Sequence, residues 1–152
     1  MESPDPRKPM EVALDDAVQG WRHWLLTRDR PELYSTQWAS QGGVWTPRRT
    51  ALATCPYGCD RLVVPNPSCS CGFYLRREPG EDPDITPQAE RDCIVIPGRA
   101  AGWGKVIEGG VGWRTSKAYP TELWVPYGAA WLAPGLKEAY KCKVNVSNEV
   151  TV

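Results

Sequence analysis

The sequence contains a single histidine, and its 18 basic and 18 acidic side chains leave no net charge. Zero net charge provides no long-range field that would attract nucleic acid or an anionic membrane. Nothing in the sequence requires His23 to lie beside Cys93 or Cys142, as a cysteine–histidine nucleophile pair would need. The chain also lacks a GxSxG motif, a P-loop and a dinucleotide-binding fingerprint. These absences predict a protein that is not an enzyme. His23, within the strand-like segment WRHWLL, is predicted to be a half-exposed strand residue.

Long hydrophobic runs are missing as well. No stretch approaches the roughly 20 apolar residues that a membrane-spanning helix needs. The first ten residues, MESPDPRKPM, hold charges and prolines where a secretory signal would have an apolar segment. We therefore expect a cytoplasmic protein with no membrane partner. Stable disulfides are rare in a reducing cytoplasm, which bears on the six cysteines of this chain.

Turn-forming residues are plentiful, since 14 glycines and 15 prolines occur among 152 residues. This composition favours short strands joined by turns over long helices, and the length suits one domain. The predicted fold class is mainly β (α+β): a small, bent antiparallel barrel or sandwich with a zinc-knuckle-like insertion and a short C-terminal helix. The predicted organisation is a flexible leader (1–18), one zinc-stabilised β-rich domain (19–146) containing an acidic, proline-rich loop (78–90), and a tail (147–152).

Hydrophobic patterns place the main elements. Large residues alternate on both sides of the turn-like TRDRPE, which predicts a hairpin of residues 21–26 with residues 33–38. Four further short strands are predicted at residues 93–96, 102–107, 113–116 and 123–125, with a hairpin turn at EGGVG. Apolar residues recur at helical spacing in YGAAWLAPGLKEAYKCKV, and Pro134 and Gly135 divide this segment into a turn and a short helix.

Four of the six cysteines lie within seventeen positions, spaced C-x3-C-x9-C-x-C: Cys55, Cys59, Cys69 and Cys71. Two close ligand pairs joined by a loop are typical of structural zinc sites, and Gly58 and Gly72 allow backbone amides to turn toward the thiolates. The weakly apolar loop between the pairs would need a metal to hold it against chain entropy. Four thiolates would leave no coordination position for a substrate, so a catalytic zinc is disfavoured.

Two alternatives to the zinc site remain open at this point: two disulfides, or four reduced and partly buried thiols. Disulfides are disfavoured by the missing secretory signal. Cys93 and Cys142 lie outside the cluster, each in an apolar context, and are predicted to be ordinary core thiols.

Three stretches of the chain resemble a family of small, uncharacterised, cysteine-rich proteins of actinobacteria and their bacteriophages. They are GWRHWLL…ELYS, ATCPYGC…PSCSCGFYLRR and GRAAGWGKVIEGGVGWRTSKAYPTELWV, which together span about half of the chain. The resemblance implies zinc binding by the four clustered cysteines and brings no established activity. The chain departs from the family at residues 78–90, where relatives continue into a helix-like stretch.

With catalytic groups missing, the sequence predicts a binding module. Tryptophan and arginine are enriched at the energetic centres of protein interfaces, so the expected partner is a cellular protein, or a host protein in the host cytoplasm if a phage encodes the chain. The alternative is a module for single-stranded nucleic acid, whose bases stack on aromatic rings beside basic side chains. For either partner the candidate residues are Trp103, Lys105, Trp113, Arg114, Lys117, Tyr119 and Trp124.

Overall fold

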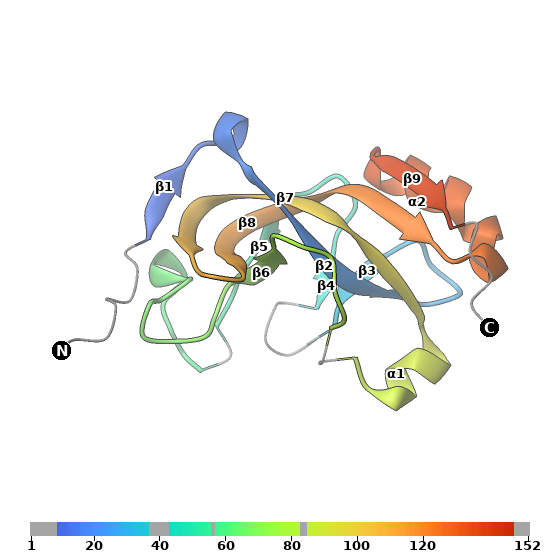
Figure 1. Ribbon diagram of the computed structural model, residues 1–152, viewed down its shortest axis with the longest axis horizontal. Coiled ribbons are helices and arrows are strands. Elements are labelled where there is room, and N and C mark those ends of the chain that lie inside the picture. The colour runs from blue at the N-terminus through green and yellow to red at the C-terminus, as the bar shows by residue number, and fades with distance from the viewer. Residues whose placement is uncertain (1–8, 37–42, 56, 83–84, 148–152) are drawn as a thin grey trace.

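The computed structural model describes residues 9–36, 43–55, 57–82 and 85–147 (Figure 1). Over these residues the strands are β1 (Met10–Val12), β2 (Val18–Leu26), β3 (Leu33–Ser35), β4 (Val44–Trp45), β5 (Ala51–Leu52), β6 (Phe73–Arg76), β7 (Ile94–Glu108), β8 (Gly112–Val125) and β9 (Lys143–Val146). The helical elements are α1 (Pro87–Asp92), α2 (Ala133–Tyr140) and the 3-10 turns η1 (Leu14–Asp16), η2 (Arg61–Val63) and η3 (Tyr127–Leu132).

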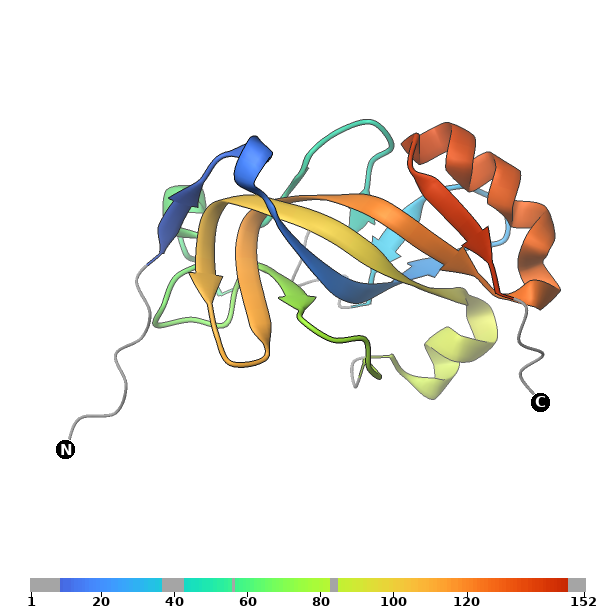
Figure 2. The same cartoon turned by 45° about the horizontal axis from the view of Figure 1, so that its top comes forward.

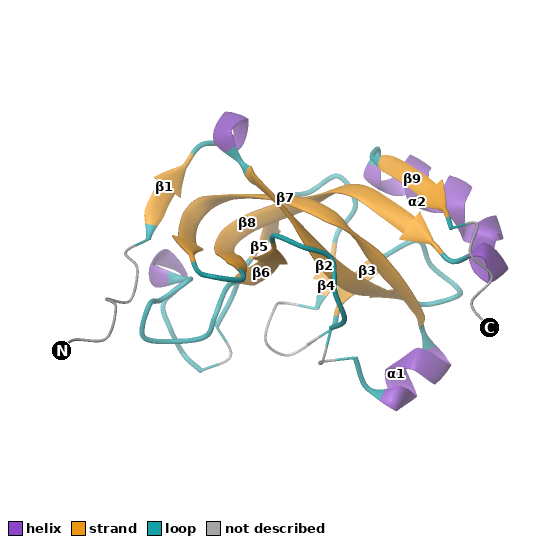
Figure 3. Cartoon of the chain, in the orientation of Figure 1, coloured by secondary structure: helices purple, strands orange, loops and turns teal. Residues whose placement is uncertain are grey.

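All of these strands belong to one sheet, which is antiparallel except where β9 runs parallel to β8 (Figure 3). The prediction of a mainly β, antiparallel fold with a short C-terminal helix is confirmed. The predicted 21–26 hairpin is also confirmed where β2 pairs with β3, and the far end of its second strand, Trp38, lies outside the described residues.

The hairpin of β7 and β8 organises the sheet. The two strands pair from Gly98 to Glu108 of β7, and their register shifts after Arg99 and again after Trp103. The prediction of four short strands in this region is therefore wrong, because each pair of predicted strands belongs to one long strand. Register shifts of this kind bend a strand without ending it, so glycines and prolines that indicated turns in the sequence lie within curved strands instead.

The sheet curls back on itself. β2 pairs with β7, β6 pairs with β8, and β6 also meets β2 at one residue pair, Trp21 with Arg76. One pair does not close the sheet into a barrel over the described residues, so the predicted barrel or sandwich is matched only loosely. Gly112 allows the close approach of β8 to β6, because a Cβ atom there would lie 1.9 Å from the carbonyl oxygen of Leu75.

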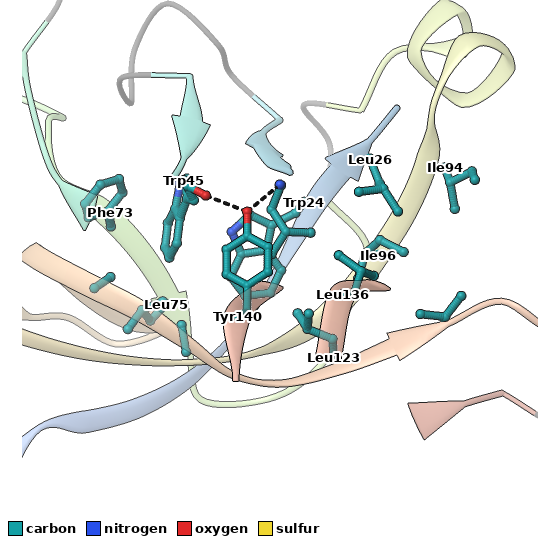
Figure 4. Close-up of a cluster of buried hydrophobic side chains, with 14 of the residues drawn as sticks. Trp24, Leu26, Trp45, Phe73, Leu75, Ile94, Ile96, Leu123, Leu136 and Tyr140 are labelled. Carbon is teal, nitrogen blue, oxygen red and sulfur yellow. Dashed lines mark hydrogen bonds between the residues drawn. The ribbon is translucent and has the colours of Figure 1, made fainter. Parts of the chain in front are cut away.

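The core lies inside this curl, between the β7–β8 hairpin and strands β2, β3, β4 and β6 (Figure 4). Trp24 and Trp45 meet edge to face with ring centroids 5.2 Å apart, and Phe73 lies 4.8 Å from Trp45. The buried Arg22 guanidinium lies 4.7 Å from the centre of the Trp45 ring, a cation–π arrangement that suits a desolvated cation. Desolvation lowers the pKa of Arg22 to about 10.

The C-terminal segment packs at the opposite end of the sheet from β1 (Figure 2). The structure confirms the predicted division of this segment, because η3 ends at Leu132 and α2 has Pro134 in its first turn. The hydroxyl of Tyr140, the last residue of α2, reaches into the core, accepting a hydrogen bond from the Leu33 N–H and donating one to the Trp45 carbonyl.

Two segments that were predicted to be irregular, the leader (1–18) and the loop (78–90), contain regular structure in their described residues. The described part of the predicted leader contains β1, which pairs with β7, and β2 begins at Val18. β1 is short and largely exposed. The strand therefore forms because it pairs with β7, and not because its residues alternate between apolar and polar. The predicted 78–90 loop includes the start of α1, where the Thr86 hydroxyl accepts a hydrogen bond from the Ala89 N–H. Among the described residues, the helices are all too short or too polar to cross a membrane.

Candidate metal centre

Four cysteine sulfurs meet in the segment between β5 and β6 (green in Figure 1), whose described residues form loops and the single turn η2. All four lie within 4.8 Å of one another, with 3.6 Å between the sulfurs of Cys55 and Cys69. Sulfurs around a tetrahedral ion at about 2.3 Å would be about 3.8 Å apart. The cluster of Cys55, Cys59, Cys69 and Cys71 therefore fits one metal ion bound by four thiolates, as the spacing predicts.

Backbone and side-chain amides surround the sulfurs. The Tyr57 N–H donates to Cys55 Sγ at 3.4 Å, and the Asn66 N–H donates to Cys71 Sγ at 3.3 Å. Gly58 and Gly72 adopt φ of 98° and 109°, in the left-handed region that glycine favours. Amide donors to sulfur orient thiolates and offset their negative charge.

The thiols differ in acidity because they share hydrogen bonds. Desolvation opposes a charge on Cys55, but the backbone amides of Cys59 and Tyr57 and the neighbouring thiols donate to its sulfur and lower its pKa to about 6. The hydrogen bond with Cys55, together with desolvation, raises the pKa of Cys59 to about 12, and desolvation raises the pKa of Cys71. Without a metal, loss of a proton is therefore favoured at Cys55 and opposed at Cys59 and Cys71.

Two of the residues predicted to bind a partner make hydrogen bonds that join this segment to the sheet. Arg114 of β8 donates from Nη1 to the carbonyl oxygens of Cys69 at 2.6 Å, Cys71 at 2.9 Å and Asn66 at 3.3 Å. Lys105 of β7 donates from Nζ to the carbonyl oxygen of Leu62 in η2. Both side chains therefore form hydrogen bonds within the protein, between the sheet and the cysteine-containing segment.

Two more of the predicted partner residues also make internal contacts. Trp113 packs against the core with the Arg77 guanidinium 4.4 Å from its ring centre. The Tyr119 hydroxyl donates to the Tyr140 carbonyl at 2.7 Å and accepts from the Arg48 N–H at 3.0 Å.

The remaining three predicted partner residues are half-buried or exposed on the sheet. Trp103 lies directly opposite Lys117 in the β7–β8 pair. Trp124 stacks against Trp21, with ring centroids 5.2 Å apart. The structure thus divides the seven predicted residues among several environments, and their binding role stays a prediction.

The sequence did not single out Asn66, whose N–H donates to Cys71 Sγ and whose Nδ2 donates to Cys59 Sγ. The pattern PNPS indicates only a turn, and the Asn66 Oδ1 atom accepts the Ser68 N–H at 2.9 Å in that turn. Its contacts to two sulfurs depend on the folded loop, so no local pattern could have revealed them.

Cys93, Cys142 and His23 lie away from the cluster. Cys142 packs against the core, and burial raises its pKa to about 11. Cys93 is half-buried at the end of α1, and burial raises its pKa as well. His23 is half-buried on β2, and burial lowers its pKa.

Comparison of the chain with protein-family models, with curated proteins and with solved structures gives no match.

Proposed function

We propose that the protein is a non-enzymatic protein-binding module whose exposed loop is stabilised by a structural Zn²⁺ ion. The cluster of four convergent cysteine sulfurs carries this proposal. A tetrahedral set of four thiolates suits zinc and leaves no position for water or a substrate, so the ion would serve folding rather than catalysis.

The loop that the metal would hold exposes large apolar side chains. Tyr57 is 76% exposed, Leu62 77% and Val63 43%. Apolar side chains gathered on one segment are typical of protein contact sites, and a segment fixed in advance loses less entropy when it binds. The resemblance to proteins of actinobacteria and their phages suggests a host protein in the cytoplasm as the partner.

Photo-crosslinking in the full-length, metal-loaded protein tests this surface. A photoreactive residue at position 62 should crosslink to a protein in an actinobacterial lysate, whereas the same residue at Tyr127, which is exposed on η3, should not. Unlabelled wild-type protein should compete, and Leu62→Asp should compete at least about 10-fold less well, as expected for a central contact residue. Equal crosslinking at both positions, or equal competition, would contradict the proposal.

A second candidate, binding of single-stranded nucleic acid, is favoured by one observation on the sheet. Trp103 lies beside Lys117, and the Trp21–Trp124 pair has the Arg99 guanidinium 5.6 Å from its Trp21 ring. Bases stack on such rings while cations contact phosphates. Crosslinks from position 103 that disappear after nuclease treatment would support this candidate over a protein partner.

The acidity of the cluster makes metal binding strongly dependent on pH. Because the pKa values of Cys59 and Cys71 are raised, binding must displace at least two protons near neutral pH. We expect the apparent Zn²⁺ affinity to fall by at least about 100-fold for each unit decrease in pH below 8, and more steeply below pH 6, where Cys55 also gains a proton. Competition with a chelator of known affinity at several pH values measures this slope, and a tenfold change per unit or less would contradict it.

A further inference from the structure

Asn66 lies in the loop between the two cysteine pairs and contacts one cysteine of each pair. Its backbone N–H donates to Cys71 Sγ at 3.3 Å, and its side-chain Nδ2 donates to Cys59 Sγ at 3.6 Å. The side-chain orientation is fixed by the other end of the amide, because Oδ1 accepts the Ser68 N–H at 2.9 Å. One residue thus bridges a sulfur from each pair.

Arg114 holds the same loop from the sheet. A single guanidinium nitrogen contacts the carbonyl oxygens of Asn66, Cys69 and Cys71, so it fixes the residue that donates to the sulfurs together with two of the ligands themselves. The Asn66 carbonyl also accepts the Cys69 N–H at 2.9 Å, which closes the loop on itself.

A third contact aligns the Arg114 side chain. Tyr74 is the cross-strand neighbour of Arg114 in the β6–β8 pair, and its ring centre lies 6.0 Å from the guanidinium carbon. Its hydroxyl donates to the Ser70 carbonyl, between two of the ligands, at 2.6 Å. The loop carbonyls from Asn66 to Cys71 are therefore held by side chains of two adjacent strands.

We infer that Asn66 and Arg114 are positioning residues of the metal centre: they hold the four cysteine sulfurs in place before the metal binds and set the affinity of the site for the metal. This inference rests on the proposed zinc site. Four thiolates and one Zn²⁺ carry a net charge of −2, which the Arg114 cation and the Asn66 amide donors offset without touching the ion. Lys105 acts on the same segment further away, at η2, and does not reach the ligands by any contact described above.

The test measures Zn²⁺ affinity of the full-length protein by chelator competition. Arg114→Gln and Asn66→Asp should each weaken binding by about 10- to 100-fold, the usual effect of losing an outer-layer partner. Asn66→Asp is nearly isosteric but replaces the donor to Cys59 by a carboxylate oxygen, which repels the thiolate. Arg114→Lys keeps the charge without the planar guanidinium, so its affinity should fall between those of the wild type and Arg114→Gln.

Arg77→Gln is the matched control. Arg77 also contacts a carbonyl, that of Gly109, and an aromatic ring, that of Trp113, but it holds the turn between β7 and β8 instead of the metal loop. The Zn²⁺ affinity of the Arg77→Gln variant should stay within about twofold of that of the wild type. Thermal unfolding of the metal-free variants separates a general loss of stability from a loss of affinity.

Co²⁺ substitution distinguishes failure of this inference from failure of the zinc site. Thiolate-to-cobalt charge-transfer absorption in the variants would show that the cysteine sulfurs still bind the metal. A weaker affinity would then result from the lost contacts of Asn66 or Arg114 to the ligand residues. Wild-type affinity in both Arg114→Gln and Asn66→Asp would overturn the inference while leaving the zinc site intact, whereas absence of stoichiometric metal in the wild type would overturn both. If Arg114→Gln does not fold, Asn66→Asp decides alone, because its backbone contacts remain.

Discussion

Cys71→Ser is expected to abolish stoichiometric metal binding and to lower the free energy of unfolding by at least about 4 kcal/mol, the contribution of a ligand held at a thousand times its Kd. Cys71 is the one buried sulfur of the cluster, 3% exposed, and it belongs to the same core cluster as Val64 and Phe73. Its loss therefore removes a ligand and places a hydroxyl in an apolar site. Elemental analysis and chemical denaturation of the purified protein measure the two effects.

The control for this prediction is Cys93→Ser, which replaces a half-buried cysteine outside the metal cluster. This variant should keep one metal ion per chain and unfold within about 1 kcal/mol of the wild type, as substitutions away from special sites do. A Cys71→Ser protein that retains a full equivalent of metal, or that unfolds at the wild-type denaturant concentration, would show that the four sulfurs do not form a metal centre.

Hydrogen exchange should show which part of the protein loses structure when the metal is removed. The segment between β5 and β6 contains only η2 as regular structure in its described residues, so few backbone hydrogen bonds protect it without the metal. The β7–β8 pair is long and continuous, and it does not depend on the cluster for its pairing. Removal of the metal by a chelator is therefore expected to expose the amides of residues 57–71 first, before those of β7 and β8.

The features of this protein that were predictable from sequence are the local ones. Four cysteines in seventeen positions, with glycines at the turns, are close enough along the chain for their spacing to limit the geometry, and the structure brings their sulfurs together. The division of the C-terminal segment was predictable for a similar reason, because Pro134 restricts the backbone next to it whatever the tertiary structure.

The features that depend on contacts between distant residues were not predictable. Nothing in the sequence indicated that Arg114 contacts the cysteine loop, because its hydrogen-bond partners there lie 43 to 48 residues earlier in the chain. The long strands β7 and β8 were missed because glycine and proline indicate turns, whereas pairing with neighbouring strands keeps the bent backbone extended.

Tyr140→Phe is expected to lower the free energy of unfolding by about 2–4 kcal/mol, since it leaves two buried backbone groups without their partner. The hydroxyl accepts the Leu33 N–H at 2.7 Å and donates to the Trp45 carbonyl, which joins the end of α2 to β3 and β4 (dashed lines in Figure 4). Burial raises the pKa of Tyr140, so the hydroxyl remains protonated and able to donate throughout the neutral range. Equilibrium denaturation by urea measures the change.

Tyr127→Phe is the matched control, because Tyr127 is exposed on η3 whereas Tyr140 is buried. The same chemical change there should alter the free energy of unfolding by less than about 0.5 kcal/mol. The benzene ring is kept in both variants, so the difference between them isolates the two hydrogen bonds from the packing of the Tyr140 ring in the core. If the two variants unfold alike, the hydroxyl of Tyr140 has no special part in holding the β3–β4 edge against the C-terminal helix.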